Sequence, residues 1–278
     1  MATVSTSRPS AITALGGATY DALVILGDWS IFAGRTLAWM LRRRPSRGTL
    51  LPIFYSVGVH SVTVIMITGT FIGMVLAVQS YGQFHQLGLA TRLGAIINMS
   101  VVRELGPVLA ATMLAGRIGS AMAAELATMR ITEQVDALDS MGVNPIHYLV
   151  VPRFVACVLL IPLLTILADF MGVMGGALIS TKVYRIEAHH YWTHAQESVG
   201  LWDLFSGLSK STFFGAAIAL ISCHRGLNSR PGAEGVGRSA TEAFVVSFIV
   251  ILALDFFLAL FMNSLYDRIW PAGGARLF

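Results

Sequence analysis

Long apolar segments separated by short polar connections dominate the pattern of this chain. Five of them approach the roughly 20 apolar residues that a helix needs to cross a hydrocarbon core of about 30 Å. They cover residues 61–78, with an extension back towards Pro52, and residues 93–127, 154–179, 204–222 and 243–265. The pattern therefore predicts an all-α polytopic membrane protein with five transmembrane helices.

The segments between and after the spans are polar. We expect residues 79–92 to form a polar connection, and residues 182–203 to form short helices outside the membrane. In the second of these, Tyr191 and Trp192 are expected to lie at the membrane interface. The last segment, residues 266–278, is expected to be a short C-terminal tail.

The N-terminal part of the chain has a different character. Residues 1–11 are expected to be disordered, and residues 12–50 to form an interfacial amphipathic helix and a basic linker. Apolar residues recur there at helical spacing, but Asp21, Asp28 and Arg35 interrupt them, and an arginine cluster at residues 42–44 follows. A helix lying on anionic headgroups suits this pattern. A first transmembrane span is the alternative.

A short acidic segment separates the second and third spans. Between residues 132 and 141, Glu133, Asp136 and Asp139 recur every third residue. Val135, Leu138 and Met141 recur with the same spacing on another face. This spacing predicts a short helix with one charged and one apolar side, lying just outside the bilayer.

Composition and charge support the membrane assignment. Of the 278 residues, 55% are hydrophobic and 12% are charged, about half the charge of a typical soluble domain, and the mean hydropathy is +0.70. The net charge of +4 arises from basic residues beside apolar segments, which suits anionic headgroups and gives no nucleic-acid signal. The distribution of Lys and Arg predicts a multi-pass membrane protein whose N-terminus and acidic helix are cytoplasmic and whose C-terminus lies on the opposite, periplasmic side.

Charged residues inside the predicted spans are the sharpest functional signal. Each costs on the order of 2.5 to 3.5 kcal/mol near the bilayer centre unless it is paired or hydrated. They are Arg103, Glu104, Arg117, Glu125, Asp169, Lys210 and Asp255. Because Lys210 and Asp255 lie at comparable depth in the fourth and fifth spans, we predict that they form a structural ion pair.

Small residues recur at helical spacing in several spans. They include Ala111, Ala115, Gly119, Ala123 and Ala127 in the second span, and the pairs Gly69 with Gly73 and Gly172 with Gly176. Such spacing allows two helix backbones to approach closely in lipid. Packing within one chain explains each pair as well as packing between two chains does. Because five spans are few for a transport path, we also consider a homodimer.

Catalytic chemistry finds little support in the sequence. No phosphate-binding loop of the form GxxxxGK[ST] is present, so ATP hydrolysis is not expected in this chain. His189, His190 and His194 do not form the helical zinc pair with an adjacent glutamate, because Tyr191 follows His190 where that motif has glutamate, and no cysteine lies near them. We expect a protein that is not an enzyme and that has no metal site or cofactor.

Several long motifs resemble one known family. They are GTFIGMVLAVQ at residues 69–79, RELGPVLAA at 103–111, AGRIGSAMAAE at 115–125, MRITEQVDALDSMGVNPIHYLVVPRF at 129–154, IPLLT at 161–165 and LDFFL at 254–258. Together they resemble the MlaE/YrbE permease subunits of MCE-type ABC lipid transporters. The likeness extends over roughly residues 51–260 and indicates a permease domain at residues 51–265.

The resemblance implies a homodimer that works with a separate ABC ATPase subunit, a periplasmic MCE-domain protein and possibly a STAS-domain regulator. Its cargo would be phospholipid or a similar lipid, carried between the inner membrane and the MCE-domain protein to help maintain outer-membrane lipid asymmetry. By the same resemblance, Leu76, Glu104 and Leu105 line the lipid cavity. On the outer rim this chain departs from its relatives, since it has Gln83, Phe84 and Leu87.

The resemblance also makes the acidic helix an ATPase-coupling element, with Glu133, Asp136, Leu138, Asp139 and Met141 as its contact residues. Two other functions stay open from the sequence alone. An ion-driven secondary transporter would use Glu104 and Asp169 and would need no nucleotide. A membrane anchor for a periplasmic lipid-binding protein would tolerate free replacement of Glu104.

Overall fold

The computed structural model describes residues 11–42, 47–89 and 92–269, and every regular element in these ranges is helical. Within them, five helical segments are long and apolar enough to cross a membrane: Gly48–Gln86, Leu93–Ile131, Ile146–Val183, Leu201–Leu227 and Ala233–Ile269. The predicted all-α class with five spans is therefore confirmed. The expected N-terminal disorder, Arg43 and Arg44 of the arginine cluster, and most of the C-terminal tail lie outside the described residues.

The chain divides into two units, residues 1–44 and residues 45–278. The described part of the first unit is one helix, α1 (Ala11–Arg42), in the segment predicted to be an amphipathic helix. It is not among the five candidate spans. Its placement at the membrane interface stays a prediction.

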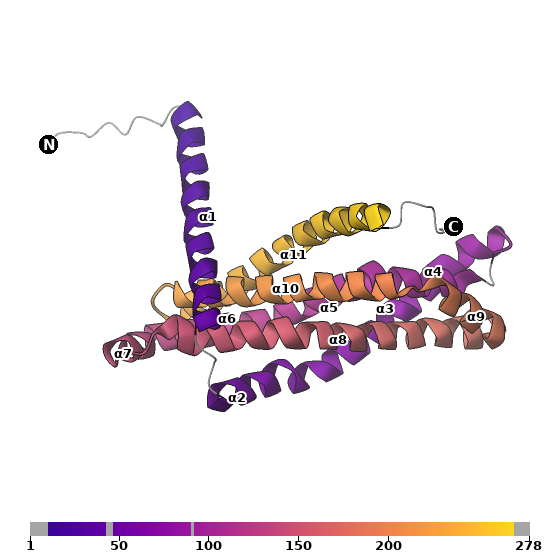
Figure 1. Cartoon of the computed structure of the whole chain (residues 1–278), viewed down its shortest axis with the longest axis horizontal. Helices are drawn as coiled ribbons and strands as arrows, with labels where there is room; N and C mark the ends of the chain where they lie inside the picture. Colours follow the sequence, from indigo (N-terminus) through magenta and orange to yellow (C-terminus); the bar gives the residue numbers. More distant parts are fainter. Residues whose placement is uncertain (1–10, 43–46, 90–91, 270–278) are drawn as a thin grey trace. The chain divides into compact units, whose positions relative to one another are not determined.

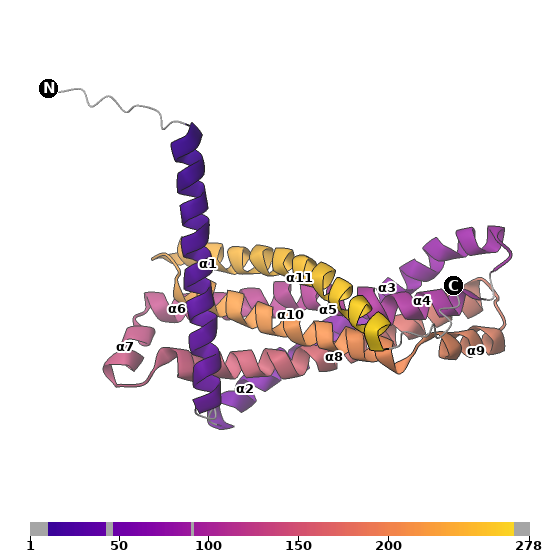
Figure 2. The same cartoon turned by 45° about the horizontal axis from the view of Figure 1, so that its top comes forward.

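The second unit contains all five spans (Figures 1 and 2). Its α-helices are α2 (Arg47–Val57), α3 (Val59–Gln86), α4 (Leu93–Ser100), α5 (Gly106–Leu114), α6 (Ser120–Ile131), α7 (Gln134–Ser140), α8 (Val151–Leu178), α9 (Ala188–Ser198), α10 (Leu201–Leu227) and α11 (Ala233–Ile269). α7 lies at one end of this unit and α9 at the other, where α9 packs against α4 (Figure 1). Tyr191 of α9 is fully buried there, so its side chain packs inside the protein, and the interfacial position of this segment stays a prediction.

Two predicted boundaries differ from the structure. The expected polar connection at residues 79–92 is helical as far as Gln86, because α3 continues beyond its apolar part. It ends in a Schellman motif: Gly88 adopts φ 71°, its N–H donates to the His85 carbonyl at 3.1 Å, and the Leu89 N–H donates to the Phe84 carbonyl at 2.9 Å. α11 likewise extends to Ile269, into the expected tail. The change from apolar to polar residues marks where a span leaves the apolar core. The helix itself continues until a capping motif ends it, so the predicted boundaries fell too early.

Within the described ranges four short π-helical turns interrupt the helices, and two of them come shortly before a proline. Val101–Leu105 precedes Pro107, and Ile146–Val150 precedes Pro152. Because proline has no N–H and its ring crowds the preceding turn, the helix widens by one residue instead of breaking. The first widened turn carries Arg103 and Glu104, so Pro107 sets the direction of both side chains.

Small residues bring α3 and α8 close together within the chain. A Cβ atom on Gly69 would lie 2.6 Å from the Ala168 carbonyl oxygen, and one on Gly73 would overlap the Gly172 carbonyl. The stripe of the second span is used in the same way, since a Cβ on Gly226 of α10 would lie 2.7 Å from the Ala123 carbonyl. These stripes pack spans of one chain against each other, and they therefore give no support to a homodimer.

Replacing Gly73 with alanine is expected to destabilise the protein by about 1–3 kcal/mol, because the added methyl group must separate two backbones. The midpoint of thermal unfolding in detergent measures the effect. Gly82→Ala in the same helix is the matched control, since a Cβ there meets no atom within 4 Å. Equal midpoints for the two variants would contradict the close packing of α3 and α8.

Candidate functional site: a charged network between spans

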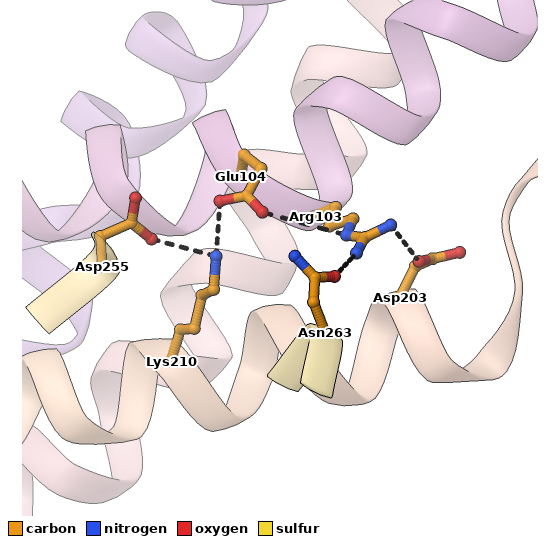
Figure 3. A network of polar contacts seen from close by, with 6 residues as sticks. All are labelled: Arg103, Glu104, Asp203, Lys210, Asp255 and Asn263. Atoms are coloured by element: carbon orange, nitrogen blue, oxygen red, sulfur yellow. Dashed lines mark hydrogen bonds and ion pairs between the residues drawn. The ribbon is translucent and has the colours of Figure 1, made fainter. Parts of the chain in front are cut away.

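Lys210 of α10 is the centre of a polar network between three spans (Figure 3). Its Nζ lies 2.5 Å from Glu104 Oε2 in the widened turn and 3.1 Å from Asp255 Oδ1 on α11. The contact with Glu104 is a hydrogen bond, whereas the contact with Asp255 is an ion pair without hydrogen-bond alignment. The structure thus places Lys210 beside Asp255, as the sequence suggested, and adds Glu104 as a closer partner.

Arg103 extends the network towards the beginning of α10. Its guanidinium donates to the side-chain oxygen of Asn263, and lies 3.8 Å from Asp203 Oδ1 and 3.9 Å from Glu104 Oε1. Asp203 also accepts a hydrogen bond from the Gly200 N–H at 3.0 Å, so it caps α10 and faces the arginine at once. Every described charge in the network therefore has an opposite charge within 4 Å.

Helix geometry explains why these residues meet. Asp203 and Lys210 are seven residues apart on α10, and Asp255 and Asn263 are eight apart on α11. Both separations are about two turns, so each helix presents both side chains on one side. Sequence reasoning missed Asp203, which was assigned to the loop, and Asn263, whose signal was an amide inside an apolar span.

Exposure differs sharply across the network. The Lys210 side chain is fully buried, whereas the side chain of Glu104 is 39% exposed. Two cations face three carboxylates, so the ionised network carries a net negative charge. The accessible oxygen atoms of Glu104 can therefore accept hydrogen bonds from a polar group that approaches from outside the chain.

The two leucines expected in the lipid cavity lie close to this turn. Leu105 follows Glu104 directly and is half-buried. Leu76 of α3 packs against a buried apolar cluster that contains Ile97 and Val101, the latter in the same widened turn.

The acidic helix α7 is held to the chain at one end only. Val135 is buried, with 7% of its surface exposed, and Asp136 is paired with Arg130 of α6. Leu138 is half-buried, whereas Asp139 is exposed and Met141 is 68% exposed. Glu133 precedes the helix with φ 59°, a left-handed conformation that turns the chain sharply after α6. The exposed residues Asp139 and Met141, at the C-terminal end of α7 and directly after it, form what we call its free end.

The other charges within the spans have separate surroundings. Arg117 donates to Ser61 Oγ at 2.5 Å, and Glu125 pairs with Arg153 at 2.9 Å. Asp169 is buried against Gly106, and its Oδ1 has no hydrogen-bond partner among the described residues. The sequence did not predict Arg153 as the partner of Glu125, because a residue at the start of a span is expected to be exposed and not buried.

The five spans and the charged side chains buried between them define a polytopic membrane protein of the permease class. The family model described as "Permease MlaE" matches residues 50–261. A probable ABC transporter permease protein from Synechocystis is 43% identical over 82% of this chain and 87% of its own length. The intermembrane phospholipid transport system permease protein MlaE of Haemophilus influenzae is 34% identical over 90% of this chain and 97% of its own.

A plant protein extends the range of relatives. The chloroplastic protein TRIGALACTOSYLDIACYLGLYCEROL 1 of Arabidopsis thaliana is 38% identical over 83% of this chain and 66% of its own length. Since the family model matches residues 50–261 and these relatives cover more than four fifths of the chain at 34–43% identity, this chain belongs to the MlaE permease family. It is a permease of the ABC transporter type.

Proposed function

We propose that this chain is the membrane subunit of an ABC transporter that moves phospholipid, or a similar lipid, between the inner membrane and a periplasmic MCE-domain protein. In this role it helps to maintain outer-membrane lipid asymmetry. Two copies form the path, and a separate subunit hydrolyses ATP, with a STAS-domain regulator as a further candidate partner. The Haemophilus relative, whose name specifies intermembrane phospholipid transport, supports the choice of cargo.

The observation that carries this proposal is the accessible carboxylate of Glu104, in the widened turn that also carries Leu105 and whose first residue, Val101, belongs to the apolar cluster that Leu76 packs against. A phospholipid has a polar headgroup next to apolar chains, and this surface offers a matching pair of contacts. Glu104 accepts hydrogen bonds from ammonium or hydroxyl donors of a headgroup, while the leucines contact acyl carbon atoms. Lys210 holds the carboxylate in position from its buried side.

The proposed coupling path begins at α7. Its exposed residues Asp139 and Met141 suit a groove on a partner protein, which is how an amphipathic helix commonly docks. Movement of that partner would pass through Val135 and the Arg130–Asp136 pair into α6. We propose that α7 and the N-terminus lie on the cytoplasmic side and that α9 and the C-terminus are periplasmic, following the distribution of Lys and Arg.

Replacing Glu104 with glutamine tests the lipid site. We expect about a tenfold or larger loss in phospholipid retained by the purified protein, because a hydrogen bond to a charged group becomes a neutral one. Quantitative lipid mass spectrometry measures the retained amount. Glu187→Gln is the control, since its carboxylate is 70% exposed and lies outside the spans. Equal lipid retention in both variants would instead favour a membrane anchor.

A further inference from the structure

A second charged site lies where α2, α6 and α8 meet. A groove of about 500 Å³ is lined there by apolar residues of α2 together with Ser56, Arg117, Ala121, Glu125 and Arg153. It shares no residue with the network around Lys210. Arg117 follows Glu104 by thirteen residues along the same span, which corresponds to about 20 Å of helix. The groove is therefore a separate site.

The charges in the groove do not balance. Arg153 is almost fully buried and is committed to Glu125 at 2.9 Å and to the Leu149 carbonyl at 2.8 Å. Arg117 donates only to the hydroxyl of Ser61, and among the described residues no carboxylate lies within ion-pair distance of it. A permanently charged guanidinium thus faces the groove with part of its donor set unused. An unpaired cation within a span is costly unless an anion or water joins it.

The surroundings point to the kind of anion. Ser56 lies eight residues after Gly48, where the first candidate span begins, so it is about 12 Å along that helix. The groove is thus nearer the beginning of this 39-residue segment than its middle. The groove adjoins the apolar side of α2. On the second span it is lined by residues of the half that contains α6, and α6 leads into α7. A phosphate group attached to acyl chains would satisfy both the charge and the apolar wall.

We propose that this groove binds the phosphate of a phospholipid from the leaflet on the α7 side, with Arg117 as the main ligand. Arginine suits this role because its planar donors match phosphate oxygen atoms. The site requires neither transport nor the cavity at Glu104, and so goes beyond the proposed function. A free phosphate ion shares the headgroup's chemistry but lacks the acyl chains that α2 would contact.

Lipid titration of the full chain in neutral detergent, followed by native mass spectrometry, tests this site. The probes are dioleoylphosphatidylglycerol, dioleoylglycerol, which lacks the phosphate, and inorganic phosphate. We expect Arg117→Gln to weaken binding of one equivalent of dioleoylphosphatidylglycerol about tenfold or more, and Arg117→Lys, which keeps the charge but not the planar donors, to weaken it less. Binding of dioleoylglycerol should not change. Arg130→Gln is the matched control, because Arg130 is on α6 but does not line this groove.

A steric variant keeps the test decisive if Arg117→Gln fails to fold. Ala121→Phe fills the groove from the exposed side of α6 and leaves the contact between Arg117 and Ser61 in place. It should lose the same lipid equivalent. Unchanged phosphatidylglycerol binding in both variants would overturn the proposal, and so would equal competition by inorganic phosphate. Loss of lipid in Glu104→Gln but not in Arg117→Gln would contradict this site alone and leave the proposed function intact.

Discussion

Replacing Lys210 with methionine is expected to lower the free energy of unfolding by about 3–5 kcal/mol, because it removes the cation beside Asp255 and the nearer of the two cations beside Glu104. Methionine has a similar length and no charge, so the loss reports on electrostatics and not on a cavity. Water at the exposed edge of Glu104 screens that carboxylate, whereas Asp255 is more enclosed. Unfolding in detergent, followed by thermal or denaturant titration, measures the change.

Two further variants separate the partners of Lys210. Adding Asp255→Leu to Lys210→Met should recover only part of the stability that Lys210→Met loses, since Glu104 still lacks the Lys210 ammonium group. Adding Glu104→Gln as well should recover most of the remaining loss of stability, because neither of the two carboxylates beside residue 210 is then left. Lys182→Met is the control, as it changes the other, exposed lysine. The account fails if Lys210→Met is no more harmful than this control.

Changing the free end of α7 should remove the ATPase subunit from the complex. In the double variant Asp139→Arg/Met141→Glu, one exposed acid is reversed and the exposed apolar side chain becomes charged. If both residues lie in the docking surface, we expect at least about a thirtyfold loss of affinity, as for central interface residues worth about 2 kcal/mol. The measurement is the ratio of ATPase to permease after affinity purification.

Two observations make the α7 test specific. Asp136 is paired with Arg130 and Val135 is buried. Neither residue is changed in this variant, so α7 should keep its packing against α6. Glu187→Arg, at the opposite end of the second unit, is the matched charge reversal and should retain the ATPase. Retention of the ATPase in both variants would mean that it docks elsewhere.

The five spans could be predicted because a helix that crosses lipid must remain apolar for about 20 residues, and that requirement is local in sequence. The ends of the helices were harder to predict from the sequence. α3 passes through the polar residues after Val78 and stops only at Gly88, where the positive φ and the Schellman hydrogen bonds close it. Burial of Tyr191 was also missed, because it depends on how α9 meets α4.

The site was predictable as a set of charges in need of partners, but not as a network. The sequence predicted the pair Lys210 and Asp255 because the two residues lie at comparable depth in the fourth and fifth spans. The choice of Glu104 as the closer partner depends on the rotation of the second span, which the widened turn before Pro107 alters. The small-residue stripes were ambiguous for a related reason, since the same spacing serves contacts within a chain and between chains.

Mass spectrometry of what co-purifies with the wild-type protein from its native membrane tests the central claim most directly. The account predicts one ATPase with a GxxxxGK[ST] phosphate loop, together with bound phospholipid, and loss of the ATPase but not of the lipid in Asp139→Arg/Met141→Glu. Absence of any ATPase from the wild-type sample would contradict the account. Glu104 and the buried, unpaired Asp169 would then be tested as proton sites of an ion-driven transporter.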